Sequence, residues 1–420
     1  MIDRMKFERV VLPNGITIYA RKTDDPFAIA KIVVPVGHMH NVGLVTPGTA
    51  HFLEHMVCNR SDAFPDIDSY NRFVGLSGGK SNASTSISRT EYWVSASTHT
   101  FKQAFSGLVS RVFRPVLDES DLRNEITVIS NERNRKSKWY PGENKLEKYL
   151  KNEWRWSQPV SLRQVFGSDD DLAQMNVRDL RLFHQNYFDS RVHLIIGGSF
   201  DLDFVIQQLL GIVTAPRELP FEFRQNSWVN PTFHEVALSE TNRFIYKVAG
   251  ISDSNSIEQI AGLKFLLTML TNSIHGPLFH WLRNELGWSY ELGYSLSAGY
   301  DNVLNASWSM DMPVQTREQA MHVRAAIHTK ILEAITNNEL IRTEVRRMVL
   351  GGVFSYQRLG DCIKAAESCI LYFGRIINEE EETAIINFVS NPDFLRAVYD
   401  KYIAPNVMGE ILISPVSSVT

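Results

Sequence analysis

The sequence predicts an α+β protein with two similar domains, each an α/β sandwich in which helices cover a sheet. A chain of 420 residues is longer than a single compact core usually supports, so it has room for two domains. The order strand, helix, strand pair, helix occurs in residues 1–215 and again in residues 229–420. Residues 216–228 combine prolines with charges of both signs, which is typical of a linker.

The first half begins with strand patterns and continues with helical ones. Residues 9–22 form two short alternating runs around Pro13, Asn14 and Gly15, which predicts a hairpin. Residues 28–37 are rich in β-branched side chains and suit a buried strand. The remaining expected elements are helices at 46–60 and 65–76, two antiparallel strands within 78–97, and helices at 99–113 and 118–138.

The second half repeats this order. A strand is expected within 234–250, followed by a long helix at 255–273 and a short helix at 276–287. Two strands at 289–300 and 302–312 precede a long helix at 316–337. The segment after residue 340 predicts further helices and a last strand near 408–416.

Composition and charge exclude several classes of protein. The formal net charge of −4 gives no electrostatic footprint for nucleic acid. No run reaches the roughly 18 consecutive apolar residues that a membrane span requires. The N-terminal residues lack the apolar core of a signal peptide, and three cysteines make no disulfide framework. We therefore expect a cytoplasmic protein that binds neither nucleic acid nor membrane.

The segment "HFLEH" within the helix at 46–60 carries the strongest chemical signal. His51, Glu54 and His55 are spaced i, i+3 and i+4, so they share one helical face. We expect Thr46 or Thr49, beside Pro47, to cap this helix. Two imidazoles one turn apart can bind one tetrahedral Zn²⁺, and the glutamate between them can take a proton from a zinc-bound water. This H-x-x-E-H order marks the inverzincin class.

Other histidines and a cysteine lie near this motif. Cys58 is on the same helical face but would crowd the metal, so we interpret it as a small core residue. His38 and His40 have strand spacing that aims both rings to one side. They are compatible with a separate metal site, although a polar rim of a loop is the simpler interpretation.

A catalytic zinc needs a third protein ligand, and the helix at 118–138 offers one. Glu125 and Glu132 lie on its apolar stripe, where a carboxylate is costly unless it is paired or coordinated. Metal binding would offset that cost for Glu132, and Glu125, two turns earlier, could orient a ligating imidazole. The alternative is that both glutamates lie on a solvent-exposed edge of the helix. The H-x-x-E-H motif favours the metal-binding interpretation.

The motif, the 76 residues between His55 and Glu132, and a glutamate seven positions before Glu132 resemble the pitrilysin family of zinc peptidases. The segments "LPNGITIYARK" and "SNASTSISRTEYWVSA" are similar to the family's opening strands and active-site edge strand. The resemblance implies one zinc per chain on His51, His55 and Glu132, with Glu54 as general base. It also implies that the chain is half of a clamshell chamber.

The polar strand pattern "GGKSNASTS" predicts an exposed sheet edge that could pair with an extended peptide. A plain surface strand is the alternative. By the resemblance, Asn82 and Ala83 contact the substrate backbone near the scissile bond.

Arg283 and Tyr290 surround Gly287 in the second half, and on sequence alone they are packing and surface residues. They resemble a family pair in which Tyr stabilises the oxyanion and Arg holds a substrate carbonyl. Long family members carry the zinc motif and this pair in different halves. The short chain carries both, so we expect a homodimer in which each pair serves the partner's zinc. A heterodimer with a related subunit is the alternative.

These observations predict a zinc metalloendopeptidase that hydrolyses short or unfolded peptides inside a dimer-enclosed chamber. Two alternatives stay open: a leader-peptide maturation peptidase acting with a partner chain, and a non-catalytic peptide-binding or scaffold subunit. The sequence specifies neither the peptide substrate nor its cleavage preference. His38, His40 and Cys58 depart from the residues that family members usually carry, so the shape of the substrate pocket is an open question.

Overall fold

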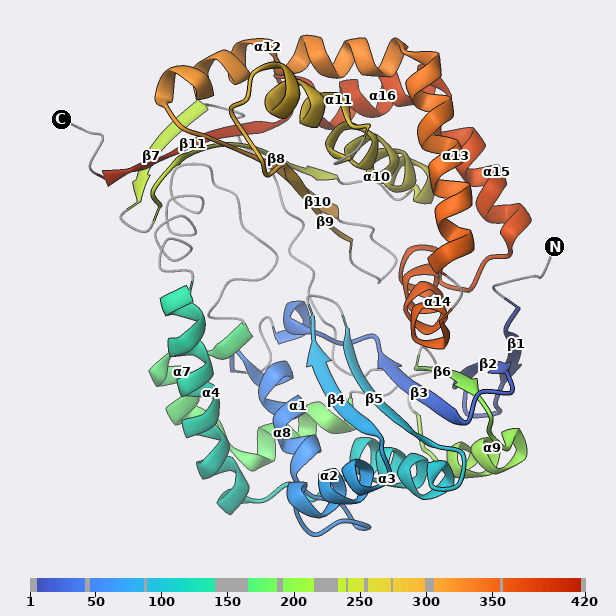
Figure 1. Ribbon diagram of the computed structural model, residues 1–420. Helices are drawn as coiled ribbons and strands as arrows, with labels where there is room; N and C mark the ends of the chain where they lie inside the picture. The colour runs from blue at the N-terminus through green and yellow to red at the C-terminus, as the bar shows by residue number, and fades with distance from the viewer. Residues whose placement is uncertain are drawn as a thin grey trace.

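A computed structural model of the protein describes residues 6–41, 46–86, 89–139, 165–186, 192–214, 233–238, 241–252, 256–272, 275–298, 306–355 and 358–416. These residues form two mixed sheets, one from each half of the chain, and each sheet is covered by helices (Figure 1). The α+β class and the repeated order of elements that the sequence predicts are confirmed.

The first sheet has six strands in the order β1-β2-β6-β3-β5-β4. All neighbours are antiparallel except β2 and β6. The hairpin between β1 and β2 turns through Gly15, whose φ is 86°, a conformation that glycine adopts without steric cost. The strands are β1 (Glu8–Val11), β2 (Thr17–Lys22), β3 (Phe27–Val34), β4 (Lys80–Thr85), β5 (Thr90–Ser97) and β6 (His193–Gly198).

Helices of the first half cover one face of this sheet (Figure 1). Residues of β2 alternate between two apolar clusters: Ile18 and Ala20 join the helices of the first half, and Tyr19 faces the opposite side. The helices are α1 (Thr49–Asn59), α2 (Ile67–Leu76), α3 (Phe101–Phe113), α4 (Glu119–Trp139), α7 (Asp169–Gln174), α8 (Val177–Gln185) and α9 (Leu202–Leu210), and a 3₁₀ turn, η1, spans His38–Asn41.

The second sheet has five strands in the order β7-β11-β8-β10-β9. Only β7 and β11 are parallel neighbours. The single strand expected within 234–250 is two strands, β7 (Phe233–Leu238) and β8 (Phe244–Ser252). The others are β9 (Gly293–Ala298), β10 (Ala306–Val314) and β11 (Gly409–Pro415). Tyr246, Trp308 and Met310 project from this sheet into the core below its helices.

Most helices of the second half pack on this sheet, and the others extend toward the first half (Figure 1). They are α10 (Ile257–Thr271), α11 (Pro277–Phe279), the π-helical turn η2 (His280–Glu285), α12 (Arg317–Thr336), α13 (Asn338–Ser355), α14 (Leu359–Phe373), α15 (Glu379–Val389) and α16 (Pro392–Tyr402). None of them, nor any other helix in the described ranges, has the length and apolar character that a membrane crossing demands.

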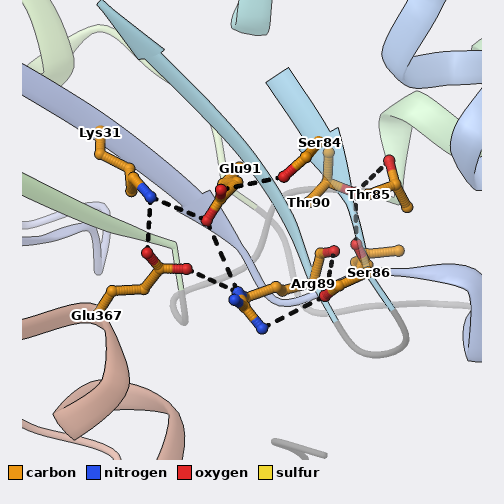
Figure 2. Close-up of polar contacts among 9 residues, drawn as sticks. Lys31, Ser84, Thr85, Ser86, Arg89, Thr90, Glu91 and Glu367 are labelled. Carbon is orange, nitrogen blue, oxygen red and sulfur yellow. Dashed lines mark hydrogen bonds and ion pairs between the residues drawn. The ribbon is translucent and has the colours of Figure 1, made fainter. Parts of the chain in front are cut away.

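Helix α14 belongs to the second half by sequence but packs against the first sheet. Its residues Ile363, Ala366 and Ile370 share an apolar cluster with Tyr19 and Ile195. A group of charges accompanies this contact, because Glu367 accepts hydrogen bonds from Lys31 Nζ at 2.6 Å and from Arg89 Nε at 2.8 Å (Figure 2). The two halves are therefore joined by buried apolar and ionic contacts.

Two expectations about local structure have other outcomes. Neither Thr46 nor Thr49 caps α1: the N-cap is Gly48 with φ 92°, and the Thr49 hydroxyl donates to the carbonyl of Thr46. A Cβ on Gly48 would lie 2.8 Å from the backbone nitrogen of Gly167, which explains a residue without a side chain there. The expected linker at 216–228 lies outside the described residues, so the domain boundaries 1–215 and 229–420 stay a prediction.

Candidate metal centre

Helix α1 presents two histidines on a buried face. Leu53, Met56 and Val57 are completely buried and anchor the opposite face of the helix in the core. This packing fixes the rotation of α1, because its apolar side faces the core of the first half. His51 and His55 then project together, with ring centroids 4.7 Å apart.

Helix α4 brings Glu132 to the same point. Leu122 and Ile129 bury one side of α4, and the helix packs against α1. Glu132 Oε2 lies 3.7 Å from Nε2 of His51 and 3.7 Å from Nε2 of His55. One ligand atom from each of the three residues lies within 4.8 Å of the others.

This donor set fits a zinc ion. Tetrahedral Zn²⁺ with bonds of about 2.0–2.1 Å holds its ligand atoms about 3.3 Å apart, close to the two 3.7 Å separations. Two imidazole nitrogens and one carboxylate are also the donor types that zinc takes in catalytic sites.

Glu125 forms a hydrogen bond with the His55 ring on the side away from Glu132. Its Oε2 lies 2.9 Å from Nδ1 of His55, and its Oε1 accepts a hydrogen bond from Asn59 at 3.0 Å. Burial alone would lower the pKa of His55, but the hydrogen bond to Glu125 and the charges of Glu54 and Glu132 raise it above its usual value. A carboxylate on Nδ1 leaves Nε2 as the metal-binding nitrogen and fixes the ring.

Glu54 lies on the same helix and is only 8% exposed. Burial raises the pKa of its carboxyl, and the opposing hydrogen bond from Thr85 only partly compensates. Thr85 Oγ1 donates to Glu54 Oε2 at 2.8 Å, and Thr90 Oγ1 lies 3.3 Å from that hydroxyl. The sequence reasoning missed Thr85. Strand alternation could have found it, since Ala83 and Thr85 share one face of β4.

His38 and His40 do not form a polar rim, because both are buried. Nε2 of His38 lies 3.0 Å from the carbonyl oxygen of Thr85, and burial lowers the pKa of His38 to about 4. His40 accepts a hydrogen bond from the Gly37 amide through Nδ1. His38 is therefore neutral at pH 7. Its hydrogen bond joins η1 to β4, the strand whose Thr85 donates to Glu54.

A cavity of about 790 Å³ opens beside these residues. Its wall includes His51, Glu54, His55 and Glu132, and it continues past Cys58 to α3. Cys58 is half-buried and packs against the core, as the sequence suggests, but it also lines this cavity. Burial raises the pKa of its thiol to about 11, so it is protonated at neutral pH.

Comparison with known proteins identifies the family. A model described as Insulinase (Peptidase family M16) matches residues 16–163, which include the metal centre. A second model, described as Peptidase M16 inactive domain, matches residues 174–349. The chain belongs to peptidase family M16. This agrees with the resemblance to pitrilysin-type peptidases in the sequence.

Individual relatives place this M16 chain among proteins of different lengths. It is 25% identical over 225 residues to Insulin-degrading enzyme-like 2 of Arabidopsis thaliana, covering 48% of this chain and 21% of that protein. It spans about a fifth or less of the first curated relatives it matches.

Solved structures share the fold over nearly the whole chain. A protease from Helicobacter pylori matches with a TM-score of 0.79 at 14% identity, over 98% of this chain and 99% of that one. The periplasmic protease PqqL from Escherichia coli matches with a TM-score of 0.74 at 15% identity, over 99% of this chain but 48% of PqqL. The M16 chain therefore corresponds in length to the first structure and to about half of the second.

The strand β4 borders the cavity in this M16 chain. It is the last strand of its sheet and pairs only with β5 among the described strands. Asn82 is exposed and Ala83 packs partly against the core, and both line the cavity. Gly79 lets β5 approach closely, since a Cβ there would lie 2.1 Å from the Ser95 carbonyl oxygen.

Arg283 and Tyr290 are not brought to the metal centre of their own chain: neither is among the described residues that line its cavity. Arg283 lies in η2 and stacks on Tyr290, with its Cζ 5.3 Å from the ring centroid. Tyr290 is 76% exposed. The M16 chain thus presents both side chains on its surface.

Proposed function

We propose that this chain is a zinc-dependent endopeptidase that hydrolyses short or unfolded peptides. The observation that carries the proposal is the convergence of His51, His55 and Glu132 beside the buried carboxyl of Glu54. Membership of peptidase family M16 supports the same chemistry.

His51, His55 and Glu132 would hold one Zn²⁺, and Glu125 would keep the His55 ring in place through Nδ1. When bound, the metal supplies a Lewis acid that polarises the scissile carbonyl and makes water a stronger nucleophile. The three candidate ligands come from two helices whose other faces are fixed in the core, so their geometry is set before substrate arrives.

Glu54 is the proposed general base. It takes a proton from the attacking water and passes it to the leaving amine. Its burial raises the pKa of the carboxyl, which makes it a stronger base than an exposed glutamate. Thr85 holds one carboxylate oxygen and so fixes the direction of the other.

We propose that peptide substrate adds to the first sheet along β4. The open edge offers main-chain hydrogen bonds that do not depend on substrate sequence. Asn82 and Ala83, which line the cavity on this strand, are the proposed contacts to the substrate backbone. An extended peptide is required for such pairing, so folded proteins are poor substrates.

We further propose that the active form is a homodimer in the cytoplasm. Tyr290 would stabilise the oxyanion, and Arg283 a substrate carbonyl, at the metal centre of the partner. The exposure of Tyr290 and the length of the chain, which matches half of PqqL, support this arrangement. Within the described residues, Cys58, Cys362 and Cys369 form no disulfide, which agrees with a reducing compartment.

Metal content, native mass and cleavage of a quenched peptide library test this function together. We expect one zinc per chain, a mass of two chains, and cleavage that a chelator abolishes and added zinc restores. Stoichiometric zinc without cleavage of any library peptide would contradict the peptidase proposal.

A further inference from the structure

Arg111 is a buried cation in the wall of the active-site cavity. It lies near the end of α3, is 7% exposed, and lines the cavity together with His55 and Cys58. Its Nη2 donates to the carbonyl oxygen of Cys58 at the end of α1. Its Cζ lies 4.3 Å from the ring centroid of Tyr70.

No carboxylate neutralises this guanidinium within the described ranges of the chain. Nε of Arg111 is buried and has no hydrogen-bond partner, and no ion pair includes the residue there. The nearby carboxylates are occupied: Asp62 pairs with Arg114, and Glu125 binds His55 and Asn59. Burying a charge without a counterion is expensive, so an unpaired guanidinium at this depth calls for an anion.

A purely structural role explains only part of this geometry. The Cys58 carbonyl engages one nitrogen, and Tyr70 covers one face of the guanidinium. Nε of the planar group has no hydrogen-bond partner among the described residues, and arginine binds carboxylates through two parallel N–H groups. The small side chain of Cys58 leaves room beside them, in the same cavity as the metal centre.

The other carboxylates of the cavity do not neutralise Arg111, so they do not remove its affinity for a carboxylate ligand. Glu125 is held by His55, Glu54 accepts a hydrogen bond from Thr85, and Glu132 is a candidate metal ligand. Apolar side chains, including Leu108 and Val112, form much of the wall near Arg111 and weaken solvent screening. A carboxylate that enters this part of the cavity therefore meets one buried positive group.

We infer that Arg111 forms a substrate subsite for a carboxylate, and that the enzyme prefers peptides with Asp or Glu at one position next to the scissile bond. The inference rests on the proposed peptidase function, whose substrate class it narrows. Arg111 acts here as a specificity-determining residue, because it contacts a substrate side chain and not the reacting atoms.

The test compares quenched peptides that differ only in Glu, Gln or Lys at each position flanking the cleaved bond. We expect kcat/KM to favour Glu over Gln by about tenfold at one position, as for a charge-assisted hydrogen bond. Arg111→Met should bring this ratio close to one, and Arg111→Lys should retain part of it. Lys102→Met, which removes an exposed cation from the same helix, is the matched control and should leave the ratio unchanged.

A binding measurement separates this inference from the proposed function. The dissociation constants of the Glu and Gln peptides are measured with metal-free protein, for the unaltered chain and for both Arg111 variants. A Glu preference that disappears in Arg111→Met supports the subsite even if the metal-loaded protein cleaves nothing. A folded Arg111→Met protein with an unchanged Glu-to-Gln ratio would overturn the inference, as would an unaltered chain with no Glu preference in either measurement.

Discussion

The Nδ1 atom of His55 lies 2.9 Å from Oε2 of Glu125, one carboxylate seven residues before the candidate ligand Glu132 on the same helix. Helix α4 therefore supplies both a candidate ligand and the group that orients another ligand. We therefore expect metal affinity to depend on Glu125, which is not itself a candidate ligand.

We predict that Glu125→Gln weakens zinc binding by about 10- to 100-fold, since the amide orients His55 less firmly and gives up the negative charge. Competition with a chromogenic chelator measures the affinity. Glu119→Gln, at the exposed start of α4, is the matched control and should bind zinc like the unaltered protein. Equal affinity of the two variants would contradict the orienting role of Glu125.

Glu54 and Thr85 should differ in the size of their effects on turnover. Glu54→Gln should lower kcat by roughly 10²–10⁴-fold with zinc still bound, because the variant cannot accept the proton of water. Thr85→Val should lower kcat less, and Thr85→Ser should restore most of the loss, because only the hydroxyl contacts Glu54. Turnover of Glu54→Gln at the unaltered rate would exclude it as the general base.

The charges between α14 and the first sheet should contribute strongly to stability. Glu367→Gln should lower the free energy of unfolding by about 3 kcal/mol, because Lys31 and Arg89 lose their shared carboxylate in a buried setting. Glu380→Gln, on the exposed side of α15, should change it little. Urea denaturation of both variants measures the difference, and equal midpoints would rule out a stabilising role for this contact.

The same group of charges should make stability depend on pH. Burial would raise the pKa of Glu91, but its contacts with the cations Lys31 and Arg89 hold it at about 2. Unfolded glutamate titrates near 4.3, so ionised Glu91 stabilises the fold above about pH 4.3, and this contribution is lost as the pH falls toward 2. The stability gap between the unaltered protein and Glu91→Gln should therefore be smaller at pH 3 than at pH 7.

The dimer proposal predicts complementation between two inactive chains. In a mixed dimer of Glu54→Gln and Tyr290→Phe chains, one centre has both an intact Glu54 and an intact partner Tyr290. Random mixing should recover about a quarter of the activity of the unaltered enzyme, because half of the dimers are mixed and each has one complete centre. No recovery in a mixture that forms mixed dimers would show that Tyr290 does not serve the partner.

Strong local patterns explain why most of the fold was predictable. The hairpin at Gly15, the helix of His51 and the helix of Glu125 all follow from short-range signals. The N-terminus of α1 could not be predicted in this way. Its cap is Gly48 because a side chain there would collide with the backbone of Gly167, which is far away in the sequence. The packing of α14 on the first sheet could not be predicted from the sequence either, because an apolar helix face does not specify which sheet it covers.

The candidate site was predictable where spacing along one helix determines geometry. His51, Glu54 and His55 share a face by helical periodicity alone, and Glu125 and Glu132 do so on α4. Thr85 and Arg111 were missed, and the role assigned to His38 was wrong, because these residues reach the cavity from separate elements and depend on tertiary contacts.

The position of α14 limits how the chain can be truncated into fragments that fold. Cutting the chain after the first half would leave Tyr19, Val33 and Ile195 facing water, although residues far downstream cover them in the intact protein. Such a fragment would expose an apolar sheet surface and should aggregate. A fragment that carries α14, as a fused segment or an added peptide, should remain soluble. The smallest autonomous folding unit that contains the metal-binding helices is therefore discontinuous in sequence.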